Sequence, residues 1–123
     1  SLYNEKVMKA FSDPQNVGEI ENADGVGVVG NPSCGDIMKI TLRIRDGKIE
    51  DAKFQTFGCA AAIATSSTAT QMVKGMTLEE AERLTNAQVV EELEGLPPQK
   101  IHCSVLAEEA IKKAIEDYRS KQK

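Results

Sequence analysis

The middle of the chain carries the alternation of apolar and polar residues that is typical of β-strands with one buried face. Apolar side chains recur at every second position from Ile40 to Ile44, and the residues between them are basic or hydroxylated. The pattern continues beyond Asp46-Gly47, a dipeptide that favours two-residue hairpin turns. We therefore predict a hairpin over residues 37–58 with one face of the sheet in water. A β-branched run at residues 25–30 adds a strand and predicts a three-stranded antiparallel meander.

Helical periodicity flanks the predicted strands on both sides. Apolar residues spaced three to four positions apart in residues 2–11 predict a short amphipathic helix that ends before Pro14. Residues 15–24 show no period, which indicates an irregular connection. After the strands, the alanine-rich segment that starts at Cys59 favours a helix closed by Gly75.

Three further elements follow toward the C-terminus. The TLEE sequence at residues 77–80 has the form of a capping box and predicts a short helix. Asn86 is expected to cap the next helix, and Pro97-Pro98 predicts an extended segment. Apolar spacing over residues 105–118 predicts a long amphipathic helix that opens at Cys103. This order predicts an α+β, two-layer fold in which a three-stranded antiparallel sheet packs with about four to five helices.

Composition narrows the class of protein. A length of 123 residues predicts a single domain over residues 1–123. With 41% hydrophobic residues, 28% charged residues and no tryptophan, the chain is expected to be globular with an aliphatic core. A formal net charge of −4 and the lack of a basic run argue against nucleic-acid binding.

The sequence also predicts a cytoplasmic protein that does not span a membrane. Its apolar stretches are far shorter than the roughly 18 to 20 residues that cross a bilayer, and its N-terminus lacks the layout of a signal peptide. Three cysteines, an odd number, favour reduced thiols over a disulfide framework.

The three cysteines fall in similar places relative to the predicted elements. Cys59 and Cys103 each open a helix, where unpaired N–H groups and the helix dipole stabilise a thiolate. Cys34 lies in the loop between the first two strands, two residues before Asp36. Chain order puts this loop at the end of the sheet where the third strand finishes and the Cys59 helix begins. The three sulfurs can therefore meet there.

His102, the single histidine, directly precedes Cys103 and extends the set to three thiolates and an imidazole, with Asp36 as a fifth donor. Such a set suits a tetrahedral Cys3His zinc site and also an iron–sulfur cluster. A carboxylate or imidazole in place of a fourth thiolate favours an exchangeable site. Structural interpretations stay open: buried core cysteines, Asp36 as a turn cap, His102 as an interfacial residue, and residues 96–100 as a rigid lead into the last helix.

Three motifs taken together resemble the iron–sulfur cluster scaffold family, which comprises IscU and the N-terminal domain of NifU. They are CGD at residues 34–36, FGCAAAIATSS at 57–67 and LPPQKIHCSVLAEEAI at 96–111. The resemblance covers nearly the whole chain, and IHCSVLAEEAI is highly specific. It implies an α+β scaffold, rather than a turnover enzyme, on which a [2Fe–2S] cluster is assembled and then handed to apoproteins.

The resemblance also implies roles for individual residues. Cys34, Cys59 and Cys103 would be cluster ligands, with His102 or Asp36 completing the site. Asp36 would keep the cluster labile, and Cys103 would receive persulfide sulfur from a cysteine desulfurase of the IscS or NifS type. Iron would bind the same ligands, and zinc would occupy them in the cluster-free form.

The family further implies protein partners. Besides the desulfurase, these are apo iron–sulfur acceptor proteins, an Hsp70-type chaperone pair, and a donor of iron or electrons. The chaperone would bind the segment formed by Leu96, Pro97, Pro98, Gln99 and Lys100. Relatives with a dedicated Hsp70-type partner carry valine in place of Gln99. Losing that apolar side chain from a bound peptide costs about 1.5 to 3 kcal/mol if it is fully buried, so dependence on a chaperone is an open question.

Other features place the chain within or outside branches of the family. Ala60-Ala61 follows Cys59 where the family commonly has glycine and serine, a change that leaves the ligand untouched and is expected to stiffen the loop. No insertion separates Cys59 from the C-terminal motif, and His102 is present, which argues against the zinc-dependent SufU branch.

Two alternatives from other functional classes remain: a Cys3His protein with structural zinc, and a sulfur carrier that uses Cys103 only. Structural zinc needs no Asp36, and a simple sulfur relay needs neither Cys34 nor Cys59.

Overall fold

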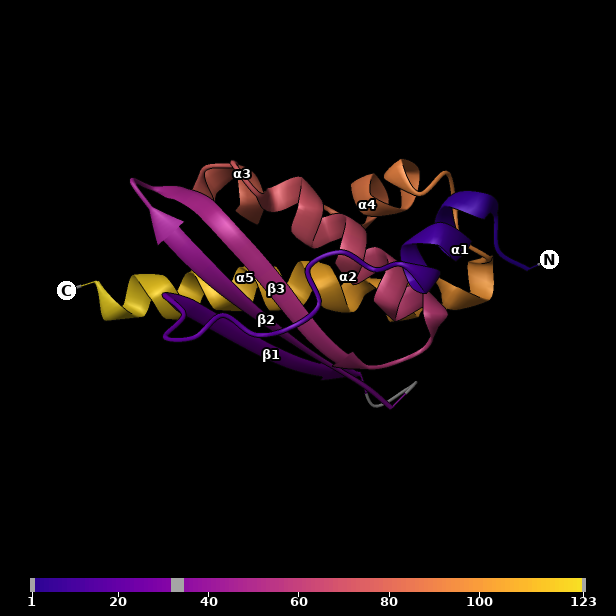
Figure 1. Cartoon of the computed structure of the whole chain (residues 1–123), viewed down its shortest axis with the longest axis horizontal. Helices are drawn as coiled ribbons and strands as arrows, with labels where there is room; N and C mark the ends of the chain where they lie inside the picture. The colour runs from indigo at the N-terminus through magenta and orange to yellow at the C-terminus, as the bar shows by residue number, and fades with distance from the viewer. Residues whose placement is uncertain (1, 32–34, 123) are drawn as a thin grey trace.

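The computed structural model describes residues 2–31 and 35–122, with only the backbone described at Asn31 and Cys103. Its elements, in chain order, are α1 (Glu5–Ser12), β1 (Gly25–Asn31), β2 (Asp36–Arg45), β3 (Lys48–Phe57), α2 (Ala60–Val73), α3 (Leu78–Glu82), α4 (Asn86–Glu92), the 3-10 helix η1 (Pro98–Lys100) and α5 (Ile101–Lys121). Within the described residues the sheet has three antiparallel strands in the order β1-β2-β3. Helices α2 and α5 pack against this sheet, which confirms the predicted two-layer α+β fold (Figure 1).

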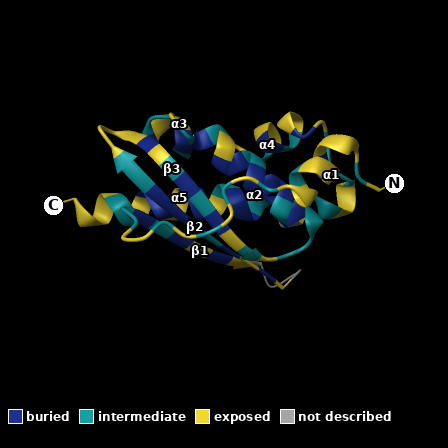
Figure 2. Cartoon of the chain, in the orientation of Figure 1, coloured by how far each residue is buried: buried dark blue, intermediate teal, exposed yellow. Residues whose placement is uncertain are grey.

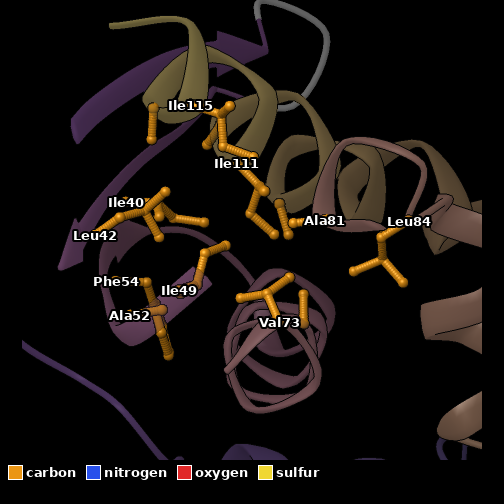
Figure 3. Close-up of a cluster of buried hydrophobic side chains, with 14 of the residues drawn as sticks. Ile40, Leu42, Ile49, Ala52, Phe54, Val73, Ala81, Leu84, Ile111 and Ile115 are labelled. Carbon is orange, nitrogen blue, oxygen red and sulfur yellow. The ribbon is translucent and has the colours of Figure 1, made fainter. Parts of the chain in front are cut away.

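The hairpin between β2 and β3 forms where the sequence predicts it. Asp46 and Gly47 both have positive φ, 54° and 73°, as a two-residue turn of this type requires. Buried and more exposed positions then alternate along most of both strands (Figure 2). The buried apolar side chains of β2 and β3 pack in one cluster with side chains of α2 and α5. Figure 3 shows side chains of the sheet, including Ile40 and Leu42, gathered with those of α5, including Ile111. This cluster is the main core of the molecule.

The outer face of the sheet differs from its prediction, because it is not simply in water. Thr41 is only 2% exposed, and its hydroxyl accepts a hydrogen bond from the Ile20 N–H at 3.0 Å. The irregular connection over residues 15–24 crosses this face (Figure 1). It also forms an ion pair between Glu19 and Lys39 and offers carbonyl oxygens to Arg43. An alternating strand pattern cannot reveal a covering segment that has no period of its own.

Helix α5 lies directly on the backbone of β1. A Cβ placed on Gly25 would lie 2.3 Å from the carbonyl oxygen of Ala114, and one on Gly27 would lie 2.2 Å from that of Ala110. The two glycines therefore let the helix approach the strand more closely than any side chain would allow. The carboxylate of Asp117 reinforces the contact, since its Oδ2 accepts the Val26 N–H at 2.9 Å.

A second, smaller hydrophobic cluster lies around α1 and is separate from the main core. Its buried members are Val7, Ala64 and Leu93, with partly buried residues such as Leu96 packed against them. Asn4 links its parts: Oδ1 caps α1 by accepting the Val7 N–H at 2.9 Å, and Nδ2 donates to the Leu93 carbonyl at 3.0 Å. The start of α1 is thus tied to the end of α4.

Two predicted boundaries toward the C-terminus are wrong. The cap of α4 is Thr85 rather than Asn86, because Thr85 forms a capping box with Gln88. The segment after Pro97 is not extended: it forms the 3-10 turn η1, closed by the Lys100 N–H donating to the Pro97 carbonyl at 2.8 Å. Helix α5 therefore begins at Ile101, two residues earlier than predicted.

The contact between α5 and β1 predicts the effect of adding a methyl group. Gly27→Ala forces the strand away from the helix backbone, and we expect it to lower the free energy of unfolding by about 1 to 3 kcal/mol. Gly30→Ala on the same strand is the control, since its nearest heavy atom would lie at 3.8 Å, and we expect a change within about 0.5 kcal/mol. Urea unfolding of both variants measures the difference. Equal losses in the two would contradict the close-approach role of Gly27.

Candidate functional site

The first residue of β2, Asp36, is a buried carboxylate with an unsatisfied oxygen. Its side chain is 6% exposed, and its Oδ2 has no hydrogen-bond partner within the part of the chain that the structure describes. Buried polar groups in folded proteins nearly always have partners, because leaving one unpaired costs about 1 to 3 kcal/mol, and more if it is charged. A buried carboxylate oxygen of this kind points to a bound ligand.

The end of β3 lies across from Asp36. The register pairs Ile37 with Phe57, so Gly58 and Cys59 follow at the same end of the sheet. The Cγ of Asp36 lies 3.1 Å from the position that a Cβ on Gly58 would occupy, which brings the carboxyl directly against this segment. Asp36 and the backbone just before Cys59 are therefore neighbours.

Cys59 occupies the N-cap position of the 14-residue helix α2, as the sequence predicts. Its backbone is extended, with φ −75° and ψ 174°, and its side chain makes no capping hydrogen bond. The thiol is free and half-buried. At a helix start, unpaired N–H groups and the positive end of the dipole favour anionic ligands. The position suits a thiolate.

The start of α5 comes level with the same end of the sheet. Ala114 faces Gly25 and Ala110 faces Gly27, so the helix runs backward along β1. A strand rises about 3.3 Å per residue and a helix about 1.5 Å, so the four residues from Gly27 to the end of β1 correspond to about nine residues of helix. The first turn of α5, which contains His102 and Cys103, thus lies near the height of Asn31 and Asp36.

A polar network fixes the first turn of α5 against α4. The buried Ser104 donates its hydroxyl to Asn86 Oδ1 and to the Ile101 carbonyl, both at 2.6 Å, and Glu108 accepts the Asn86 N–H at 2.5 Å. Burial alone would raise the pKa of Glu108. Hydrogen bonds from Lys112 and from the Asn86 N–H, with the charge of Lys112, outweigh it and lower that pKa below its ordinary value. Glu108 is therefore held ionised as a fixed acceptor, which ties the start of α4 to the long helix.

The structure brings together some of the predicted site residues and leaves others aside. The Asp36 carboxyl packs against Gly58, the residue before Cys59, and exposed His102 lies in the first turn of α5. Cys34 lies outside the described residues, and the side chain of Cys103 is not described. Among the side chains that are described, no three metal-binding groups of the His, Cys, Asp or Glu type gather at one point. The full ligand set therefore stays a prediction.

The predicted partner segment, residues 96–100, lies next to the small cluster around α1. Leu96 packs against that cluster, while Pro98 and Gln99 are exposed on the 3-10 turn. The segment is therefore accessible in part, in a turn rather than in the extended form that the sequence predicted.

Exposed apolar side chains border the site, and the sequence analysis missed them. Phe57 is 83% exposed, its register partner Ile37 is 50% exposed, and Val28 on β1 is 51% exposed. They lie on the outer face of the sheet, and Ile37 and Phe57 lie at the end where β2 begins and β3 ends. An apolar residue at a polar position of the alternating pattern was the available signal. A patch of this kind next to a site is typical of a protein-binding surface.

Within the described residues, no helix combines the length and the apolar character that a membrane span requires.

Comparison with known proteins provides independent evidence about the family of this chain. A profile of the NifU-like N terminal domain matches residues 2–123. The iron-sulfur cluster assembly scaffold protein IscU 1 of Archaeoglobus fulgidus is 61% identical over 95% of this chain and 76% of its own length. The IscU scaffold protein of Escherichia coli is 54% identical over 98% of this chain and 96% of its own.

A solved structure supports the fold. The crystal structure of a NifU-like protein (N-terminal) from Brucella abortus matches with a TM-score of 0.80 at 22% identity, over 98% of this chain and 96% of that one. The curated relatives are named as assembly scaffold proteins rather than as enzymes, and the resemblance read from the three motifs is confirmed. The chain belongs to the iron–sulfur cluster assembly scaffold family of IscU and the N-terminal domain of NifU.

Proposed function

We propose that this chain assembles a [2Fe–2S] cluster from iron and from sulfur supplied by a cysteine desulfurase, and then passes the cluster to apo acceptor proteins. The observation that carries the proposal is the buried carboxylate of Asp36, whose unpartnered Oδ2 belongs to a side chain packed against the segment that ends in Cys59. In this proposal Cys34, Cys59 and Cys103 bind the irons, and Asp36 or His102 completes the set.

The carboxylate favours a transient cargo over a permanent metal. A structural zinc site is closed by its own ligands and gains nothing from an extra buried carboxylate. A hard oxygen donor holds a sulfide-bridged iron less firmly than a thiolate does, so it provides a position from which the cluster can leave. In the cluster-free form zinc would occupy the same donors.

Sulfur enters through Cys103 in this mechanism. The Cys103 thiolate attacks the terminal sulfur of the desulfurase persulfide, a new S–S bond forms on Cys103, and the bond in the donor breaks. The desulfurase cysteine leaves as a thiolate, so this transfer balances in atoms and electrons. Reducing the transferred sulfur to the sulfide of the cluster takes two electrons per sulfur, which the ferrous irons and a separate electron donor supply. The position of Cys103 in the first turn of α5 supports this role, because a helix start favours the thiolate that must attack.

The chain presents two accessible surfaces close to the site to which partner proteins can bind. The exposed apolar residues Phe57 and Ile37 border Asp36 and suit docking of the sulfur donor and of acceptor proteins. The exposed turn at Pro98 and Gln99 suits a chaperone of the Hsp70 type. A chaperone that reads an extended peptide must first unwind η1. Reduced thiols are required throughout, which fits a cytoplasmic location.

Reconstitution tests the proposal directly. The chain is incubated anaerobically with ferrous iron, cysteine and a cysteine desulfurase, and visible absorption follows formation of the sulfide-bridged chromophore. We expect the chromophore to appear and then to move to an apo-ferredoxin. Failure to form it, or a cluster that cannot leave, would overturn the scaffold assignment.

Replacing the carboxylate tests how the cluster is kept labile. Asp36→Ala removes the oxygen donor that we propose helps the cluster to leave, so we expect a longer cluster lifetime and slower transfer, by about tenfold. Asp51→Ala is the matched control: it lies on β3 at the other end of the sheet, where its carboxylate pairs with Lys74 at 3.3 Å. The decay of visible absorption and the transfer rate to apo-ferredoxin measure both variants. Unchanged values in Asp36→Ala would refute the role of the carboxylate.

Trapping the sulfur intermediate identifies its acceptor. Cys103→Ser removes the attacking thiolate, so we expect no persulfide on the chain after incubation with desulfurase and cysteine. Cys34→Ser keeps that thiolate and should retain part of the persulfide signal in the mass spectrum of the intact chain. Loss of the signal in both variants to the same extent would argue against Cys103 as the sole receiver.

A further inference from the structure

Gly58, the residue before Cys59, occupies a slot walled by three elements. A Cβ at this position would lie 2.8 Å from the Cβ of Ala62 on α2, 3.1 Å from the Cγ of Asp36 on β2 and 3.1 Å from the Oγ1 of Thr56 on β3. Separations of this size are shorter than van der Waals contact, which for carbon atoms is about 3.5 to 4.0 Å. The slot therefore has no room for a side chain.

The glycine is required by space rather than by backbone conformation. Gly58 is not among the glycines with positive φ, so an L-residue could adopt its torsion angles. A side chain at Gly58 is therefore excluded by the neighbouring atoms and not by the backbone conformation. A substitution at Gly58 must therefore displace a neighbouring group, and its effect depends on which group moves.

The three walls differ in how firmly they are held. Thr56 is fixed by its hydroxyl, which donates to the Ile37 carbonyl at 2.7 Å. Ala62 is fully buried within α2 and cannot move without the helix. Asp36 has an oxygen with no hydrogen bond to any residue that the structure describes, so its carboxyl is the wall that yields most easily.

We propose that Gly58 is a positioning residue: its missing side chain leaves the space in which the Asp36 carboxylate lies against the start of α2, and so controls how fast the cluster departs. The inference rests on the proposed function, in which Asp36 makes the cluster labile. It assigns the placement of that carboxylate to a residue that offers no ligand of its own.

A methyl swap isolates the contact with Asp36. The double variant Gly58→Ala with Ala62→Gly moves one methyl group across the slot, which removes the 2.8 Å overlap and leaves the contacts with Asp36 and Thr56. Ala62→Gly alone is the matched background. Gly30→Ala is a second control at the same end of the sheet, since among the described residues its Cβ would approach only the backbone oxygen of Asp36, at 3.8 Å.

Two measurements, the cluster lifetime and the absorption spectrum of bound cobalt(II), report the effect of the swap. Relative to Ala62→Gly, we expect the swap to lengthen cluster lifetime about tenfold, as we expect for Asp36→Ala, because both changes move the carboxylate away from the site. Adding Asp36→Ala to the swap should produce no further lengthening, because the carboxylate is already displaced. In the cluster-free chain, the d–d absorption of bound cobalt(II) should change in the same way for the swap and for Asp36→Ala, while Gly30→Ala leaves it unaltered.

The results separate failure of this inference from failure of the proposed function. A swap whose lifetime and cobalt spectrum equal those of Ala62→Gly overturns the role of Gly58, as do effects of the swap and Asp36→Ala that simply add. If the unsubstituted chain forms no releasable cluster, the proposed function fails, and the cobalt comparison alone decides whether Gly58 places the carboxylate.

A second variant carries the test if a lowered melting temperature reveals that the swap is misfolded. Ala62→Ser fills the same slot from the α2 side with a hydroxyl that can donate to Asp36. We expect it to lengthen cluster lifetime and to alter the cobalt spectrum. No change in either would overturn the inference.

Discussion

The backbone contact between α5 and β1 determines the arrangement of the rest of the molecule. Because Gly25 and Gly27 have no side chains, the backbone of α5 packs directly against the backbone of β1. The contacts of these glycines with the carbonyl groups of α5 fix the position of the helix along the sheet. This places Ile111 and Ile115 over the apolar face of the sheet and completes the main core. The same placement carries the first turn of α5 to the end of the sheet where β2 begins and β3 ends.

The elements that the sequence predicts well are those whose causes are local. The hairpin turn at Asp46-Gly47 depends on the torsion angles of two residues, and the capping box of α3 on residues 77–80. The errors arise where a segment distant in the sequence determines the burial or the hydrogen bonding of a residue. Thr41 reads as a solvent-facing strand residue, yet the Ile20 segment buries it. Asn86 reads as a cap, yet its side chain accepts from Ser104 on α5 while Thr85 takes the cap position.

In the candidate site, too, locally determined features can be predicted from the sequence, and features that depend on packing cannot. Residue types and chain order are enough to predict that Asp36 and Cys59 lie at one end of the sheet. Sequence could not predict that the Asp36 carboxyl would be buried with a free oxygen, because that depends on how α2 docks beside it. Nor could it identify the space left by Gly58, since a glycine before a helix has many local explanations. A family motif records that such residues occur together, and the packing around them supplies a physical reason.

The small cluster around α1 gives the molecule two units of different local stability. Few buried side chains hold α1, the end of α4 and Leu96 together. The polar links between α1 and the end of α4 come from the amide of Asn4 and from Lys6, which donates to the Glu92 carbonyl and pairs with Glu94. Regions with few buried apolar contacts open at a lower free energy than the main core. A protein that captures residues 96–100 in an open form therefore has to supply only the free energy of this local opening, while the sheet, α2 and α5 stay folded. The free energy of that local opening would then set how far the partner's affinity falls below its affinity for the open form.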